Sequence, residues 1–130
     1  MRKLLLACVA AALISTSANA APLSPADKAG LQSAMVQHID RQLVDGSYMD
    51  VNLKSGEFRK LVPAKNHPMV LQMGEHFVLC TDFKTKAGES VNLDFYVARR
   101  GKSFVVFRTE IDNRAPLQAL MEAGKVAMME

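Results

Sequence analysis

The chain has 130 residues, with 16 basic and 13 acidic side chains and a formal net charge of +3 at pH 7. Arg2 and Lys3 lie in an N-terminal segment that we expect to be removed, and without them 14 basic residues face 13 acidic ones. A nucleic-acid-binding face needs a surplus of Lys and Arg. The nearly neutral balance therefore argues against nucleic acid as a partner.

The first twenty residues have the pattern of a secretory signal peptide. A basic start is followed by an apolar run from Leu4 to Ile14, and the segment ends in Ala18-Asn19-Ala20. We expect cleavage between Ala20 and Ala21, which leaves residues 21–130 as a single domain in the periplasm or outside the cell. The apolar run is too short to cross a bilayer, so we expect no transmembrane segment.

Cys80 is the only cysteine after the predicted cleavage site, because Cys8 lies in the signal peptide. An intramolecular disulfide is therefore excluded. Cys80 lies between Leu79 and Thr81 in a predicted strand, and no histidine is expected within its reach. This position predicts a buried, unreactive thiol.

The mature chain is expected to begin with an amphipathic helix. Ser24-Pro25-Ala26-Asp27 has the residues of a helix start. An apolar stripe with a spacing of four follows: Leu31, Met35, Ile39 and Leu43. We expect the helix to extend from about residue 25 to 45 and to end at Asp45-Gly46.

From Tyr48 onward the apolar residues alternate, which is typical of strands. The expected strands are Tyr48–Leu53, Phe58–Val62, Met69–Met73, His76–Phe83, Val91–Ala98 and Ser103–Ile111. A connection without regular structure is expected over Pro63–Pro68, and a three-residue loop over Arg99-Arg100-Gly101. A short helix with apolar Leu117, Leu120 and Met121 follows, capped by Asp112-Asn113 and ended near Gly124.

This order predicts an α+β fold: a long N-terminal helix packed on a twisted antiparallel sheet of five or six strands, with a short C-terminal helix. The order is similar to the cystatin-like and NTF2-like architectures. The likeness is a fold analogy and implies no function.

Strand register assigns side chains to faces. Placing Gly74-Glu75 in a hairpin loop pairs Met73 with His76, and gives the central hairpin two apolar faces that should both be covered. In the last hairpin, the three-residue loop assigns Val105, Phe107 and Ile111 to the core face. The reverse face then carries Asn92, Asp94, Tyr96, Phe104, Val106, Arg108 and Glu110.

Asp94, Tyr96 and Arg108 form the candidate ligand-binding site on that reverse face. Asp94 and Arg108 are near-diagonal neighbours and are expected to form an ion pair, with the Tyr96 hydroxyl beside them. Arg108 would offer a donor fork to a carboxylate or phosphate-like group. The alternative is a surface ion pair with a half-exposed tyrosine.

Two further groups are candidates for chemistry. His67 is expected opposite Asp82, as a paired imidazole and carboxylate or as a hydrogen bond at a strand end. His67, Met69, Met73, His76 and Cys80 are soft or borderline ligands of the kind that favour Cu(I). Strand spacing places His76 and Cys80 about 13 Å apart, which argues against one coordination sphere and leaves packing as the alternative.

The sequence holds no nucleotide, phosphate-loop or zinc motif, so we expect no cofactor and no resident metal. The leading hypothesis is a non-enzymatic module that binds a small ligand or a protein partner. The alternative is a small hydrolase- or isomerase-like enzyme with Asp94 or the His67–Asp82 pair as general base. The third is copper handling.

Overall fold

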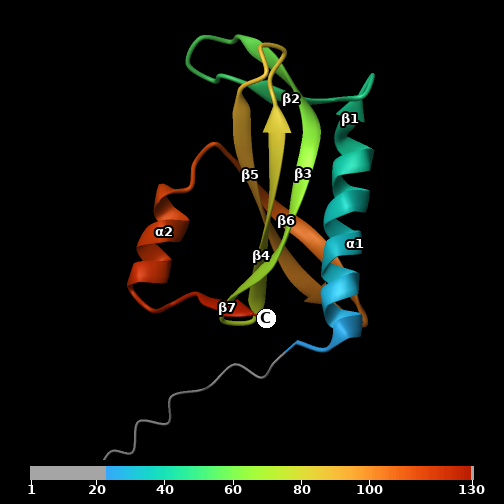
Figure 1. The fold of residues 1–130 in the computed structure, drawn as a ribbon, viewed down its shortest axis with the longest axis vertical. Helices are drawn as coiled ribbons and strands as arrows, with labels where there is room; N and C mark the ends of the chain where they lie inside the picture. Colours follow the sequence, from blue (N-terminus) through green and yellow to red (C-terminus); the bar gives the residue numbers. More distant parts are fainter. Residues whose placement is uncertain (1–22, 130) are drawn as a thin grey trace, which may run out of the picture.

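The computed structural model describes residues 23–129, so the predicted signal peptide and the cleavage site between Ala20 and Ala21 lie outside the described residues. The chain is α+β, with two helices and a seven-stranded antiparallel sheet (Figure 1). In chain order the elements are α1 (Pro25–Gln42), β1 (Leu43–Val44), β2 (Ser47–Val51), β3 (Phe58–Met73), β4 (His76–Lys84), β5 (Ser90–Arg100), β6 (Ser103–Ile111), α2 (Ala115–Glu122) and β7 (Ala127–Met129).

The predicted start of the first helix is confirmed, and its predicted end is wrong. The Ser24 side chain accepts a hydrogen bond from the backbone N–H of Asp27 at 3.0 Å, and Pro25 occupies the first turn. The helix ends at Gln42, because Leu43 is already extended and pairs with Tyr48. Asp45 and Gly46 both have positive φ angles of 49° and 77°, which suits a tight hairpin turn better than a helix cap.

β3 is one long strand across the region where the sequence predicted a connection. One side of β3 pairs with β4, while its two ends pair with β2 and β7 on the other side. Register shifts interrupt the β3–β4 ladder between Pro63 and Lys65 and between Asn66 and Val70. Proline is tolerated in strands at bulges and edges, so these irregularities accommodate Pro63 and Pro68 without ending the strand.

The sheet is covered on both faces, as the two apolar faces of the central hairpin predicted. On one face the α1 side chains Leu31, Met35 and Ile39 pack in a core with Leu79 and Phe95. On the other face a smaller cluster contains Leu71, Val78, Tyr96, Leu117 and Val126. Figure 1 shows the two helices on opposite sides of the strands.

The faces assigned to Phe104, Val106 and Phe107 of β6 are wrong. The loop of the last hairpin is Gly101-Lys102, because Arg100 pairs with Ser103. A bulge then shifts the register so that Val97 pairs with Val106 and Tyr96 with Arg108. Phe104 and Val106 therefore pack against the α1 core, and Phe107 is 52% exposed.

The C-terminal segment contains one element that the sequence did not indicate. The predicted helix is present as α2, but its cap position is Arg114 and no side chain makes a cap hydrogen bond. After Gly124, whose φ is 71°, the chain returns to the sheet as β7 and pairs with β3. Among residues 23–129, neither helix has the length and apolar character needed to cross a membrane.

Candidate functional site

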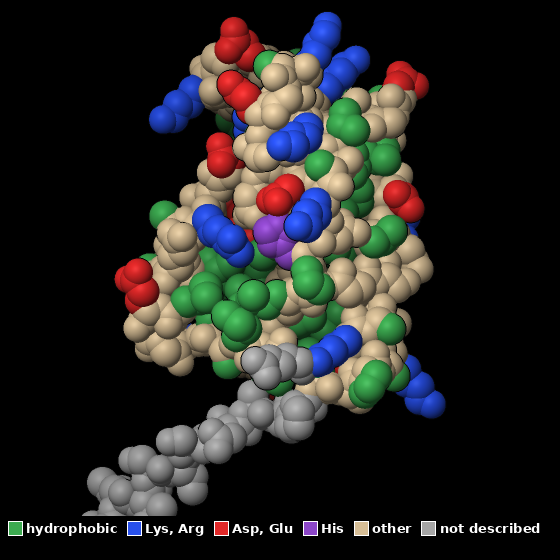
Figure 2. Space-filling view, viewed as in Figure 1, with side chains coloured by type: hydrophobic (Ala, Val, Ile, Leu, Met, Phe, Trp, Pro, Cys, Tyr) green, Lys and Arg blue, Asp and Glu red, His purple; other side chains and the backbone are tan. Residues whose placement is uncertain are grey.

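A pocket of about 290 Å³ opens between α2 and the edge of the sheet formed by β3 and β7. Its lining residues come from four elements and the cap of α2: His67, Met69, Leu71, Cys80, Arg114, Gln118, Met121 and Met128. Figure 2 shows this face, where hydrophobic side chains gather between α2 and the central strands, close to a histidine and to positive charges. The wall is thus mostly apolar and sulfur-rich, with a few polar groups, which is the usual composition of a small-ligand site.

A bulge in β3 supplies one side of this pocket. Asn66 pairs with Thr81 and Val70 pairs with Leu79, so three residues of β3 lie opposite the single residue Cys80. Regular pairing would place only one residue there. The bulge therefore lets both His67 and Met69 line the pocket together with Cys80.

The back of the pocket is a buried polar network centred on Asp94, which is 1% exposed. Its Oδ1 accepts hydrogen bonds from the Cys80 thiol at 2.8 Å and from Asn92 Nδ2 at 3.0 Å. Arg114 lies over both groups, with Nη2 3.0 Å from Cys80 Sγ and Nε 3.7 Å from Asp94 Oδ1. The guanidinium thus balances the carboxylate and keeps part of its donor fork toward solvent.

The same network keeps Cys80 protonated. Burial, followed by the hydrogen bond to Asp94, raises the pKa of the Cys80 thiol to about 12. A nucleophilic cysteine needs the opposite environment, since only the thiolate attacks. Cys80 is therefore a hydrogen-bond donor fixed in the pocket wall, and its environment does not suit a nucleophile.

The three residues of the predicted ligand site share one sheet face, and each makes its contacts with different partners. Tyr96 is 9% exposed and packs against Leu117 of α2. Arg108 points to solvent and donates through Nε to Glu110 at 2.7 Å. The predicted ion pair between Asp94 and Arg108 is wrong: Arg114 takes that place, because the turn into α2 carries it over the buried carboxylate.

His67 and Asp82 are brought together by the structure. His67 Nε2 lies 2.9 Å from Asp82 Oδ2, although Asp82 pairs in register with Lys65 and the histidine reaches it from the bulge. Each side chain is about one-third exposed. Because the bond uses Nε2, the other ring nitrogen of His67 stays available to a ligand.

The five soft ligands named from the sequence divide into two groups. His67, Met69 and Cys80 line the pocket, while Met73 and His76 pair at the far hairpin, where His76 stacks edge-on against Phe107. Met121 and Met128 complete the sulfur-lined wall. Within residues 23–129, no group of three or more His, Cys, Asp and Glu side chains is arranged to hold a metal ion.

Sequence reasoning missed five of the eight pocket residues: Leu71, Arg114, Gln118, Met121 and Met128. Met121 was assigned to the apolar side of a helix, and nothing in the sequence placed residue 128 in a strand beside β3. The one available signal was the density of methionine, since the chain has eight.

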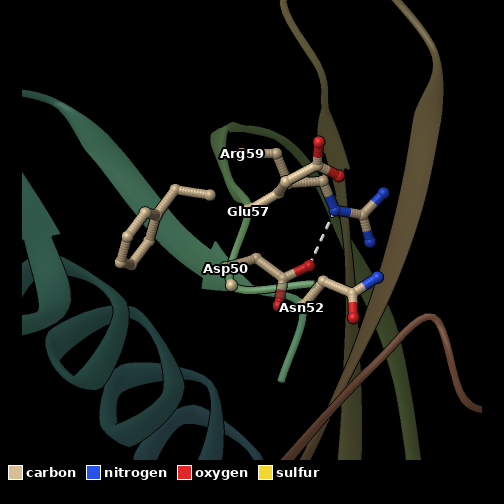
Figure 3. A pocket seen from close by; sticks show the side chains of 6 residues that line it. Asp50, Asn52, Glu57 and Arg59 are labelled. Carbon is tan, nitrogen blue, oxygen red and sulfur yellow. Dashed lines mark hydrogen bonds and ion pairs between the residues drawn. The ribbon is translucent and has the colours of Figure 1, made fainter. Parts of the chain in front are cut away.

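A larger hollow of about 720 Å³ lies at the loop between β2 and β3 (Figure 3). Two of its charged groups are already paired, because Arg59 Nε donates to Asp50 Oδ2 at 2.7 Å, and Glu57 Oε2 accepts from Ser55 Oγ at 3.3 Å. Asn52 accepts hydrogen bonds from the backbone of its own loop. The hollow is thus the inside of an exposed turn, whereas the pocket beside α2 has buried Leu71 and Cys80 in its wall.

Comparisons with models of known protein families, with curated proteins and with solved structures gave no match to this chain.

Proposed function

We propose that this protein is an exported binding module that takes a small ligand in the methionine-lined pocket beside α2. One observation carries the proposal: side chains from β3, β4, α2 and β7 converge on a cavity that their own packing leaves open. Export is supported by the signal-peptide pattern of residues 1–20.

The pocket composition favours a ligand with an apolar body and an anionic or hydrogen-bonding end. Met69, Met121 and Met128 offer flexible thioether side chains that adapt to the shape of a guest. Arg114 is 39% exposed at the rim, where it is held by Asp94. This is the role that the sequence had assigned to Arg108.

The fold analogy remains part of the proposal. The packing of α1 across one face of an antiparallel sheet supports a cystatin-like or NTF2-like arrangement. The analogy concerns the arrangement of elements alone.

The proposal is tested with anilinonaphthalene sulfonate, a dye with an apolar ring system and one sulfonate. We expect its fluorescence to increase with the native protein and to saturate. Met69→Glu should abolish the increase, because it places a negative charge on the pocket wall. Met49→Glu is the matched control, since Met69 and Met49 are 44% and 36% exposed and Met49 lies on the β2–β3 hairpin.

Two results overturn the proposal. Fluorescence that fails to increase with the folded wild type would show that the pocket takes no such molecule. Fluorescence that survives Met69→Glu but is lost in Met49→Glu would place binding on the hairpin. Circular dichroism of each variant establishes that the fold is retained.

A small hydrolase in the same pocket is the second candidate, favoured by the hydrogen-bonded His67–Asp82 pair at the pocket wall. It predicts turnover of a nitrophenyl ester that is lost in His67→Gln. Cys80 supplies no nucleophile for this candidate, because burial and the hydrogen bond to Asp94 raise the pKa of its thiol to about 12.

A further inference from the structure

The wall of the pocket beside α2 has an unusual concentration of soft donor atoms. Three methionine thioethers, one imidazole and one thiol belong to its eight lining residues: Met69, Met121, Met128, His67 and Cys80. These donors come from β3, β4, α2 and β7. The tertiary fold therefore brings them together, since they are not neighbours in the sequence. Soft sulfur ligands favour Cu(I), zinc and iron–sulfur clusters, and imidazole also suits copper. Zinc and iron–sulfur sites in proteins use cysteine thiolates, so a set dominated by methionine thioethers favours Cu(I).

The five pocket donors differ from the five residues that strand spacing separated. His76 and Cys80 lie about 13 Å apart along one strand, and a regular β3–β4 ladder would place only one residue of β3 opposite Cys80. The bulge places three residues opposite Cys80, and two of them line the pocket. His76, the ligand that strand spacing excluded, is not needed, because α2 and β7 supply Met121 and Met128.

His67 is held in the way that metal-binding histidines are held. Such a histidine usually donates its second ring N–H to a carboxylate, which fixes the ring and the position of the remaining nitrogen. In this structure Nε2 of His67 is hydrogen-bonded to Asp82 Oδ2 at 2.9 Å. The arrangement leaves Nδ1 as the donor toward a metal.

The charges around the pocket suit a monovalent cation bound by neutral donors. Arg114 is the positive group on the wall, and the buried Asp94 carboxylate 3.7 Å from its Nε balances it. The Cys80 thiol is already engaged, since it donates to Asp94 and accepts from Arg114. The thioethers and His67 are therefore the available donors, and Cys80 closes the back of the site as a thiol.

We propose that the pocket binds one Cu(I) ion through the thioethers of Met69, Met121 and Met128 and through Nδ1 of His67, with Asp82 positioning the histidine. This inference rests on the proposed function, because it names the ligand class of the same pocket.

The test is an anaerobic titration of the full exported chain with Cu(I) in competition with the chromophoric chelator bicinchoninate. We expect the wild type to withdraw one equivalent of copper from the chelator. The Met69→Leu, Met128→Leu double variant should lose this copper, since leucine keeps the apolar volume but removes the sulfur donors. Met49→Leu should bind as the wild type does.

Asp82→Asn tests the positioning of His67. Loss of a carboxylate partner of a ligating histidine typically weakens metal affinity by about 10- to 100-fold, and we expect a change of this size. A purely structural role of Asp82 would change the unfolding midpoint and leave the copper affinity unchanged.

Two results overturn the inference: a wild type that takes no copper from the chelator, or a Met49→Leu variant that loses copper as fully as the double variant. The leucine variants keep an apolar wall and should still bind the dye. Dye binding without copper binding would therefore reject the Cu(I) inference and leave the proposed function standing. A wild type that does not bind the dye, or that binds it equally well after Met69→Glu, would reject the proposed function itself.

Discussion

Replacing Cys80 with alanine and with serine tests the polar network behind the pocket. Cys80 is 4% exposed, and its thiol donates to the buried Asp94 carboxylate at 2.8 Å. Alanine removes one of the two hydrogen bonds to this carboxylate oxygen, and a hydrogen bond to a charged group contributes about 1.5–3 kcal/mol. The substitution also leaves a void of roughly a methyl group, worth about 1 kcal/mol. We therefore expect Cys80→Ala to lower the free energy of unfolding by about 2.5–4 kcal/mol.

Serine should be tolerated better than alanine, because its hydroxyl donates to the same carboxylate. We expect a loss of about 1 kcal/mol, from replacing a soft sulfur by a smaller oxygen. If Cys80 lay in a purely apolar wall, the order would reverse, since serine would bury an unsatisfied hydroxyl.

The measurement is urea unfolding followed by far-ultraviolet circular dichroism, which suits a chain without tryptophan. The difference between the two variants should shrink in an Asp94→Asn background, because an amide oxygen is a weaker acceptor than a carboxylate. Serine that destabilises the protein as much as alanine does would refute the role assigned to the Asp94 hydrogen bond.

Three further outcomes follow from the described contacts. Ellman's reagent should label Cys80 slowly in the native state and fully in urea, because the thiol is buried and its pKa is raised to about 12; rapid native labelling contradicts this. Burial lowers the pKa of His38 from 6.5, so the unfolded chain binds more protons in acid and stability should fall as the pH drops below about 6.5. His38→Gln should reduce this loss of stability, measured as the free energy of unfolding in urea at each pH. A pH dependence equal to that of the wild type would contradict the role of His38. Tyr96→Ala should cost about 3 kcal/mol or more and Arg108→Ala less than about 1 kcal/mol, since the first side chain is buried and the second is exposed; equal thermal shifts would contradict this difference.

The local patterns of the sequence predicted the helix start, the apolar stripe of α1 and the register at Met73 and His76. These features depend on residues that lie close together in the chain, such as Ser24 and Asp27 or the two sides of the Gly74 turn. The α+β class followed from the same local patterns.

Bulges, and strand pairing between segments distant in the chain, account for the features that the sequence could not predict. A two-residue loop and a bulge in the last hairpin moved Phe104 and Val106 to the α1 face, so they do not cover the face of Tyr96. The bulge at residues 67–69 and the return of β7 to β3 assembled the pocket. Both depend on contacts between distant segments, which leave no periodic signal in the chain.

The contact between Arg114 and Asp94 also could not be predicted from the sequence. The sequence predicted an ion pair between Asp94 and Arg108, the arginine within its own hairpin. The observed partner lies beyond the hairpin, at the cap of α2, where no side chain caps the helix. Its position follows from how the last helix folds back over the sheet.

The most direct test of the pocket is a nuclear magnetic resonance spectrum of the protein labelled with ¹³C on its methionine methyl groups, recorded during titration with anilinonaphthalene sulfonate. Three methionines line the pocket, while Met35 of α1 is buried in the core and Met49 lies on the distant β2–β3 hairpin. Binding beside α2 predicts saturable shifts of the Met69, Met121 and Met128 methyl signals, with Met35 and Met49 unchanged. Shifts confined to Met49, or no shift at any methionine, would contradict the proposal that this pocket is the binding site.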